Sequence, residues 1–141
     1  MIKPIVKDER KLSVKSERFI FGEDDYIIKD MIDTAEAHKN ICVGLAAVQI
    51  GYNKRVILVR NGDKFIPYIN PTIFYKGKQT YITNESCLSL EGERSVKRHV
   101  EIKMTYTDIN GKPQAKTFRD YTAQIMQHEC DHLNGVIIWK Y

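Results

Sequence analysis

Several features are missing from this sequence of 141 residues, and each absence excludes a class of protein. No apolar run approaches the roughly 20 residues that a membrane-spanning helix needs. The first 19 residues scatter charged side chains where a secretory signal requires an uninterrupted apolar stretch. We therefore expect a cytoplasmic protein with no membrane partner.

Cysteine is also scarce. Three cysteines cannot all pair, and they do not form the disulfide framework of a small secreted domain, so at least one is a free thiol or a metal ligand. The net charge of +4 is small and its basic residues are dispersed, which does not indicate a dedicated nucleic-acid-binding face. Repeats, low-complexity tracts and linkers rich in proline or serine are absent, so we expect one domain.

The apolar pattern predicts two helices around a β-rich middle. Residues 25–40 carry apolar side chains at three- and four-residue spacing, which is typical of an amphipathic helix. A second helix is expected over residues 120–134, with Asp120 as its N-cap and Gly135 as the C′ residue.

Strand candidates fill the middle of the chain. Residues 100–106 alternate apolar and polar side chains, and the pair Asn110-Gly111 is a strong turn signal. The other candidates are residues 55–60, 65–75 with breaks at Pro67 and Pro71, 78–83, and 114–118. The pattern predicts an α+β fold, with small antiparallel or mixed sheets around the late helix and a helix nearer the N-terminus.

One short motif carries metal chemistry. The second predicted helix contains HECDH at residues 128–132, which has the HExxH pattern. Its two histidines lie one turn apart on the same face, so both imidazoles can reach one metal ion. Glu129 is rotated by roughly 100° from His128, where a carboxylate can take a proton from bound water. Gln127 and Asp131 are candidates to orient the imidazole rings.

A catalytic metal site usually holds three protein ligands and one water, so a third ligand is needed. No His, Asp, Glu or Cys follows His132, and we expect this ligand upstream. Cys87 is the best candidate, since a thiolate and two imidazoles suit Fe²⁺, Co²⁺, Ni²⁺ or Zn²⁺. The other cysteines are expected to be packed residues: Cys42 adjoins an apolar segment, and Cys130 points about 160° away from His132.

Together these pieces resemble the peptide deformylase family, which has the ordered motifs G-x-G-L-A-A-x-Q, E-G-C-L-S and H-E-x-D-H. The corresponding segments here are residues 42–49 (CVGLAAVQ), 85–89 (ESCLS) and 128–132 (HECDH). The likeness extends to residues 4–6 and to the region of Arg94 and Arg98, so it covers nearly the whole chain. It implies a single deformylase-like catalytic domain over residues 1–141.

The resemblance implies the removal of the formyl group, as formate, from the N-terminal formyl-methionine of nascent polypeptides by a metal-activated water. Glu129 would act as general base and then as acid. Gln49 and the backbone N–H of Leu88 would hold the oxyanion. The metal is Fe²⁺ in the cell for most members, with Ni²⁺, Co²⁺ or Zn²⁺ as alternatives in purified protein, and transient contact with the ribosome is also implied. The implied metal ligands are Cys87, His128 and His132.

A pocket for the methionine side chain is expected beside the metal. By helical spacing, Tyr121, Gln124 and Ile125 share the face of the two histidines, although periodicity alone fits Tyr121 and Ile125 equally well as core residues. Gly44 would let the substrate backbone approach closely. The expected substrate-binding residues are Val43, Gly44, Ser86, Arg94, Tyr121, Gln124 and Ile125.

The sequence departs from the family pattern at a few places. Cys42 and Ser86 stand where the family has glycine, near the expected substrate path, and residues 90–92 lack a proline common after the second motif. We expect no additional C-terminal helix after the metal helix, so docking on the ribosome through such an extension is not implied.

Three alternative functions compete with this interpretation. A metalloprotease cleaving internal peptide bonds is disfavoured by a cysteine ligand and by the GLAAVQ segment. A non-catalytic binder of formylated or blocked N-termini is disfavoured by Glu129, because a structural metal site needs no base. An RNA- or ribosome-binding protein is suggested only by the net charge, which is too small to support it.

Overall fold

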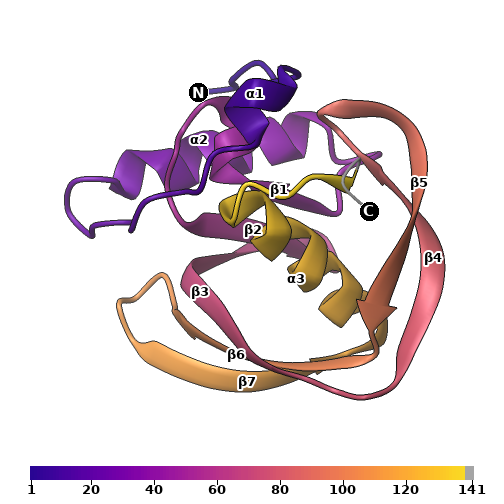
Figure 1. Ribbon diagram of the computed structural model, residues 1–141. Helices are drawn as coiled ribbons and strands as arrows, with labels where there is room; N and C mark the ends of the chain where they lie inside the picture. The colour runs from indigo at the N-terminus through magenta and orange to yellow at the C-terminus, as the bar shows by residue number, and fades with distance from the viewer. Residues whose placement is uncertain (139–141) are drawn as a thin grey trace.

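The computed structural model describes residues 1–138, which form two β-sheets and three α-helices (Figure 1). The helices are α1 (Glu9–Leu12), α2 (Asp25–Ala37) and α3 (Asp120–Leu133), with a 3₁₀ turn, η1, at Ala47–Ile50. The strands are β1 (Gly44–Ala46), β2 (Val56–Asn61), β3 (Lys64–Lys76), β4 (Thr80–Cys87), β5 (Leu90–His99), β6 (Glu101–Thr107) and β7 (Pro113–Arg119). This is the expected α+β class. Over the described range no helix is long and apolar enough to span a membrane.

The larger sheet has the strand order β1-β2-β3-β6-β7 and is antiparallel throughout, whereas β4 and β5 form a separate hairpin. Figure 1 shows α3 in the middle of the molecule, with the larger sheet on one side and the β4–β5 hairpin on another. The helix that carries the HExxH motif is therefore enclosed by both sheets.

Two hydrophobic clusters hold the helices against opposite faces of the larger sheet. Ile57 and Val59 of β2 belong to the cluster that includes Met126 of α3. Val56 and Leu58 alternate with them and belong to the cluster that includes the buried face of α2. Because successive side chains of a strand point to opposite faces, the buried sequence VILV places β2 between the two helices.

The helices begin and end close to the expected positions, with two corrections. α2 ends at Ala37 and not at Asn40. Asp120 is not the N-cap of α3: Arg119 occupies that position in extended conformation, and Asp120 is the first helical residue, with a φ of 56°. Gly135 has the expected left-handed conformation after the helix, with a φ of 74°.

The expected breaks at the two prolines of residues 65–75 were wrong, since β3 runs unbroken from Lys64 to Lys76. The strand passes Pro71 through a register shift against β6 between Ile69 and Thr72. A bulge of this kind leaves a position out of the ladder, where a residue without an N–H does little harm. Asn70, with a φ of 49°, accepts a hydrogen bond from Phe19 N through Oδ1 at 2.8 Å, which secures the irregular backbone.

The β4–β5 hairpin differs most from expectation. Residues 78–83 were expected to form a strand, but β4 begins at Thr80 and continues through Cys87, so the first three residues of the second motif end this strand and the last two lie in the turn. β5 was not expected, because the charged sequence LEGERSVKRH lacks an apolar alternation and is mostly exposed. Its pairing with β4, from Thr80–His99 to Cys87–Leu90, supplies the order that its composition does not indicate.

Candidate metal centre

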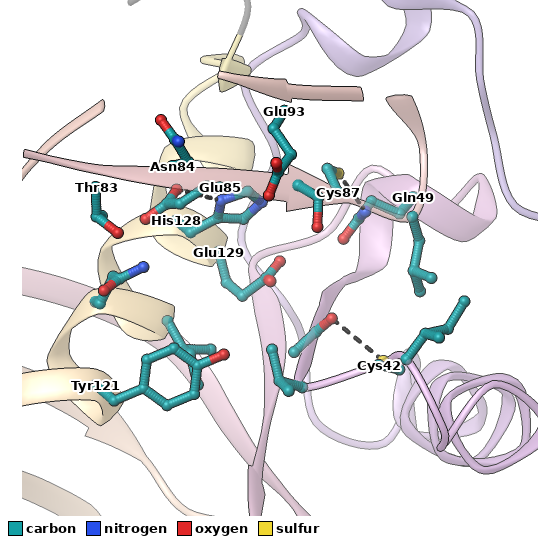
Figure 2. Close-up of a pocket in the computed structure, with 17 residues that line it drawn as sticks. Cys42, Gln49, Thr83, Asn84, Glu85, Cys87, Glu93, Tyr121, His128 and Glu129 are labelled. Atoms are coloured by element: carbon teal, nitrogen blue, oxygen red, sulfur yellow. Dashed lines mark hydrogen bonds and ion pairs between the residues drawn. The ribbon is translucent and has the colours of Figure 1, made fainter. Parts of the chain in front are cut away.

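The metal ligands expected from the sequence come together from two elements. Cys87 is the last residue of β4, and His128 and His132 lie one turn apart on α3. One ligand atom from each lies within 4.8 Å of the others, and Cys87 Sγ is 3.5 Å from His132 Nε2. Figure 2 shows Cys87, His128 and Glu129 around one cavity. The β4–β5 hairpin and the central helix therefore meet at this site.

The donor set fits a divalent transition metal. Ligand atoms bound tetrahedrally at about 2.0–2.3 Å lie roughly 3.3–3.8 Å from one another, and the observed separation of Cys87 and His132 falls in that range. Both histidines are buried, with exposed fractions of 8% for His128 and 1% for His132. One soft sulfur and two imidazole nitrogens suit iron, cobalt, nickel or zinc and not magnesium or calcium.

A carboxylate fixes the orientation of His128. Its Nδ1 lies 2.8 Å from Glu85 Oε1, so the ring turns Nε2 away from Glu85. Glu85 also accepts two hydrogen bonds from Arg98, at 2.9 Å from Nε and 2.6 Å from Nη2. Arg98 donates in turn to Asp131 at 2.8 Å. These charged side chains connect β4 and β5 to α3. Glu85 bonds to the Nδ1 side of His128 and so fixes the ring, as carboxylates do for histidines at many metal sites.

The expected orienting residues were therefore the wrong ones. Gln127 donates to the backbone oxygens of His99 and Ala123 and accepts from His99 N, so it ties α3 to the end of β5. Asp131 accepts a hydrogen bond from Arg98, which also bonds to Glu85, so Asp131 is linked to His128 through these two side chains. Glu85 was visible as the first residue of the second motif, but only the pairing of β4 with β5 brings it under α3.

Burial and hydrogen bonds together set the protonation of the site. Burial lowers the pKa of His132 to about 3, which leaves the ring neutral and able to act as a ligand. Burial opposes the charge on Glu85, but hydrogen bonds from Arg98 and His128 outweigh it and lower its pKa to about 2. For His128, burial is outweighed by hydrogen bonds to Cys87 and Glu85, which raise its pKa to about 10, so a metal ion competes with a proton there.

Glu129 is buried beside the candidate ligands. Burial raises its pKa to about 7, so the carboxyl group can gain or lose a proton near neutral pH. Within residues 1–138 its Oε1 is buried and has no hydrogen-bond partner. Its side chain lines the same cavity as His128 and Cys87 (Figure 2). A buried carboxylate without a partner is costly to keep, which points to a functional role.

Gln49 reaches the site from η1. Its Oε1 accepts a hydrogen bond from Ala46 N at 2.9 Å, which directs the amide N–H₂ toward the metal ligands. That group donates to Cys87 Sγ at 3.3 Å and to Ser89 Oγ at 3.2 Å. Leu88, the other expected oxyanion residue, lies in the β4–β5 turn and also lines the cavity. Both are therefore next to Cys87.

Gly44 is required by the helix that packs on it. A Cβ at this position would lie 2.8 Å from Glu129 Oε2 and 2.8 Å from Ile125 Cγ2. Such distances are shorter than real Cβ contacts, so a side chain here would force Glu129 and Ile125 to move, and its absence lets α3 approach β1. The sequence suggested that this glycine makes room for the substrate, whereas the structure shows the space taken by Glu129 and Ile125.

The cavity beside the metal ligands has a volume of about 670 Å³. Of the expected substrate-binding residues, six line it: Val43, Gly44, Ser86, Tyr121, Gln124 and Ile125. Arg94 does not line it and is exposed on β5, whereas its neighbour Glu93 does line it. Residues that line the cavity without having been expected as binding residues include Ile41, Thr83 and Asn84. They flank the motif residues, and that adjacency was the only signal for them.

The two remaining cysteines are packed, as expected. Cys42 is 1% exposed, its thiol donates to Gly44 O at 3.3 Å, and one side of it borders the cavity. Cys130 faces the core beside Met104. Burial raises the pKa of both thiols to about 12, so neither supplies a thiolate ligand at neutral pH.

Comparisons with known proteins agree on one family. The family model for polypeptide deformylase matches residues 2–141. The peptide deformylase of Clostridium beijerinckii is 49% identical over 138 residues, which cover 98% of this chain and all of that protein. The peptide deformylase of Brachyspira hyodysenteriae is 38% identical over 143 residues, covering 94% of this chain and 75% of that protein.

Solved structures give the same result. A Met-Ala-Ser-bound class I type b peptide deformylase from Acinetobacter baumannii has a TM-score of 0.90 at 27% identity, over 100% of this chain and 99% of that one. The peptide deformylase from Thermotoga maritima also has a TM-score of 0.90, at 30% identity, over 99% of this chain and 97% of that one.

Proposed function

The chain belongs to the polypeptide deformylase family, and we propose that Glu129 transfers the protons of its reaction beside a metal ion held by one cysteine and two histidines. It is a hydrolase that removes the N-formyl group from nascent polypeptides. The observation that carries the proposed mechanism is the position of a buried carboxylate, whose Oε1 has no hydrogen-bond partner within residues 1–138, in the cavity that Cys87 and His128 border.

The first step of the mechanism is proton removal from the attacking water. A metal ion bound by Cys87, His128 and His132 would lower the pKa of water and polarise the formyl carbonyl. Glu129 Oε1 is free to accept the proton that the water loses as its oxygen bonds to the formyl carbon. The raised pKa of Glu129, about 7, suits this role, because the group must accept the proton and then release it.

The second step is collapse of the tetrahedral intermediate. The carbon–nitrogen bond breaks, Glu129 returns its proton to the leaving amine, and formate departs. The N–H₂ of Gln49 and the backbone N–H of Leu88 would stabilise the negative charge on the formyl oxygen, and both residues lie beside Cys87. For Gln49 this means exchanging its bond to Ser89 for one to the substrate.

The substrate would lie with its methionine side chain in the 670 Å³ cavity, against Tyr121, Gln124 and Ile125. Val43 and Ser86, which also line that cavity, would contact the peptide. A class I type b relative has been solved with the peptide Met-Ala-Ser bound, which supports a short peptide as the ligand here. The role of Arg94 stays a prediction; because Arg94 does not line the cavity, it would contact the peptide beyond its N-terminal residue.

The test is formate release from formyl-Met-Ala-Ser by Glu129→Gln. The substitution preserves size but removes the base, so we expect kcat to fall by about 10²–10⁴-fold while the metal content is unchanged. Glu36→Gln, on the exposed face of α2, is the matched control and should keep full activity. Normal turnover by Glu129→Gln at full metal occupancy would remove Glu129 from the mechanism.

We further propose Fe²⁺ as the metal in the cell, with Ni²⁺, Co²⁺ or Zn²⁺ able to replace it, because a thiolate with two imidazoles accepts all four. Activity of the iron form should decline in air as iron and Cys87 oxidise, whereas nickel-loaded protein should remain active. Anaerobic purification with metal analysis tests this. We propose action in the cytoplasm on formyl-methionyl chains, with transient contact to the ribosome.

A further inference from the structure

An amide side chain, that of Gln124, lies on the helix surface that lines the methionine pocket. Gln124 lies on α3 with Tyr121 three residues before it and His128 four residues after it, and all three line the cavity. Ile125 beside it is buried and apolar, but Gln124 is only half-buried and carries an amide. A pocket for a hydrocarbon chain needs no amide at this place.

The orientation of that amide is fixed by the neighbouring hairpin. Tyr81, the second residue of β4, donates a hydrogen bond from its hydroxyl to Gln124 Oε1 at 2.8 Å. Burial raises the pKa of Tyr81, so the hydroxyl stays protonated and remains the donor. With its oxygen held by Tyr81, the amide presents its N–H₂ to other partners, and Nε2 makes no hydrogen bond within residues 1–138.

We propose that Gln124, held by Tyr81, is a specificity residue that donates a hydrogen bond to the sulfur of the substrate's N-terminal methionine. The inference rests on the proposed function, which places that side chain in this cavity. The thioether is a weak acceptor, but the isosteric norleucine side chain, with a methylene in place of sulfur, is none at all. A norleucine substrate would leave the amide covered and unpaired, a cost that a thioether avoids.

The same donor suits an oxidised substrate better still. The oxygen of methionine sulfoxide is a strong acceptor, and its polarity excludes it from a purely apolar pocket. The arrangement of Tyr81 and Gln124 therefore predicts that a formyl-methionine sulfoxide peptide is turned over, and that turnover depends on the amide. Leucine at position 124 has a similar size but offers no hydrogen-bond donor. The variant Gln124→Leu therefore tests the effect of the amide donor with little change in the shape of the pocket.

The experiment compares kcat/KM for formyl-Met-Ala-Ser and formyl-norleucine-Ala-Ser in one preparation of metal-loaded enzyme. The ratio of the two values does not depend on the fraction of active protein. We expect the wild type to prefer methionine by about fivefold or more. The one hydrogen bond that methionine accepts and norleucine does not can account for a preference of this size. In Gln124→Leu the ratio should fall to about one, and kcat/KM for the sulfoxide peptide should fall by about tenfold or more.

Tyr81→Phe tests the positioning of the amide. Without the hydroxyl the amide can rotate, so the methionine preference should shrink although Gln124 is still present. Tyr106→Phe removes a hydroxyl from a largely buried tyrosine of β6, in the hydrophobic core, and should leave the ratio unchanged. Circular dichroism melting and metal analysis of each variant report folding independently of activity.

Two outcomes would overturn the inference. A methionine-to-norleucine ratio in Gln124→Leu equal to that of the wild type would show that the amide does not sense the sulfur. A wild-type ratio near one would do the same. Absence of formate from every peptide with metal-loaded wild type would instead overturn the proposed function, and this inference with it.

Discussion

Replacing Gly44 by alanine should disable the enzyme through the helix and not through the metal. The new Cβ would lie 2.8 Å from both Glu129 Oε2 and Ile125 Cγ2, and 3.1 Å from Glu129 Cγ. Ordinary contacts begin at 3.4 Å, so each of the two nearest atoms must retreat by about 0.6 Å. Both side chains are buried but line the cavity, so they can take up the displacement by turning into it or by moving with α3. Either movement shifts the Glu129 carboxylate away from its place beside the ligand side chains.

The expected cost has two parts. Overpacking of this degree destabilises proteins by about 1–3 kcal/mol, which lowers the melting temperature by roughly 3–10 °C for a domain of this size. Misplacing a catalytic group by about 1 Å can reduce the rate by about 10²-fold, so for a shift of about 0.6 Å we expect kcat to fall by about 10- to 100-fold. The metal ligands are not among the contacts of the new Cβ, and metal content should stay near that of the wild type.

The assay measures kcat for formyl-Met-Ala-Ser, the melting temperature and the metal content of Gly44→Ala. Gly77→Ala is the matched control: Gly77 is also buried, but its added Cβ would meet Glu101 O at an acceptable 3.4 Å. The control should retain normal kcat. If Gly44→Ala keeps wild-type kcat and stability, the close approach of α3 to β1 does not constrain Glu129 and the reasoning fails.

Three further changes test the metal support. Cys87→Ser should lose most of its bound metal, because a hydroxyl replaces thiolate poorly; full occupancy by metal analysis would contradict Cys87 as a ligand. Glu85→Gln should weaken metal affinity by about 10–100-fold in chelator competition, since Glu85 holds the Nδ1 side of His128; an unchanged affinity would contradict this. Arg98→Met should destabilise folding by about 3–5 kcal/mol in urea unfolding, because it removes the buried cation that bonds to both Glu85 and Asp131; a loss below about 1 kcal/mol would show that water replaces the guanidinium.

Much of the secondary structure was predictable because it depends on local periodicity. The face of α2 that packs on the sheet and the alternation of β6 both follow from apolar spacing. β5 was missed because its order comes from pairing with β4, and its own sequence is charged. The unbroken path of β3 past Pro71 was missed because the register shift and the contacts of Asn70 with Phe19 are tertiary features.

The active site divides in the same way. The sequence by itself determined that His128, Glu129 and His132 share one helix and point in fixed directions relative to one another. Helical geometry fixes the angle between side chains one and four residues apart, whatever packs around the helix. Only the tertiary structure decided what supports them. Glu85 and Arg98 lie 13 residues apart on paired strands and reach α3 as one buried network, and Gly44 leaves the space that Glu129 fills. Such contacts depend on strand register and on the approach of α3 to β1, which no local pattern in the chain encodes.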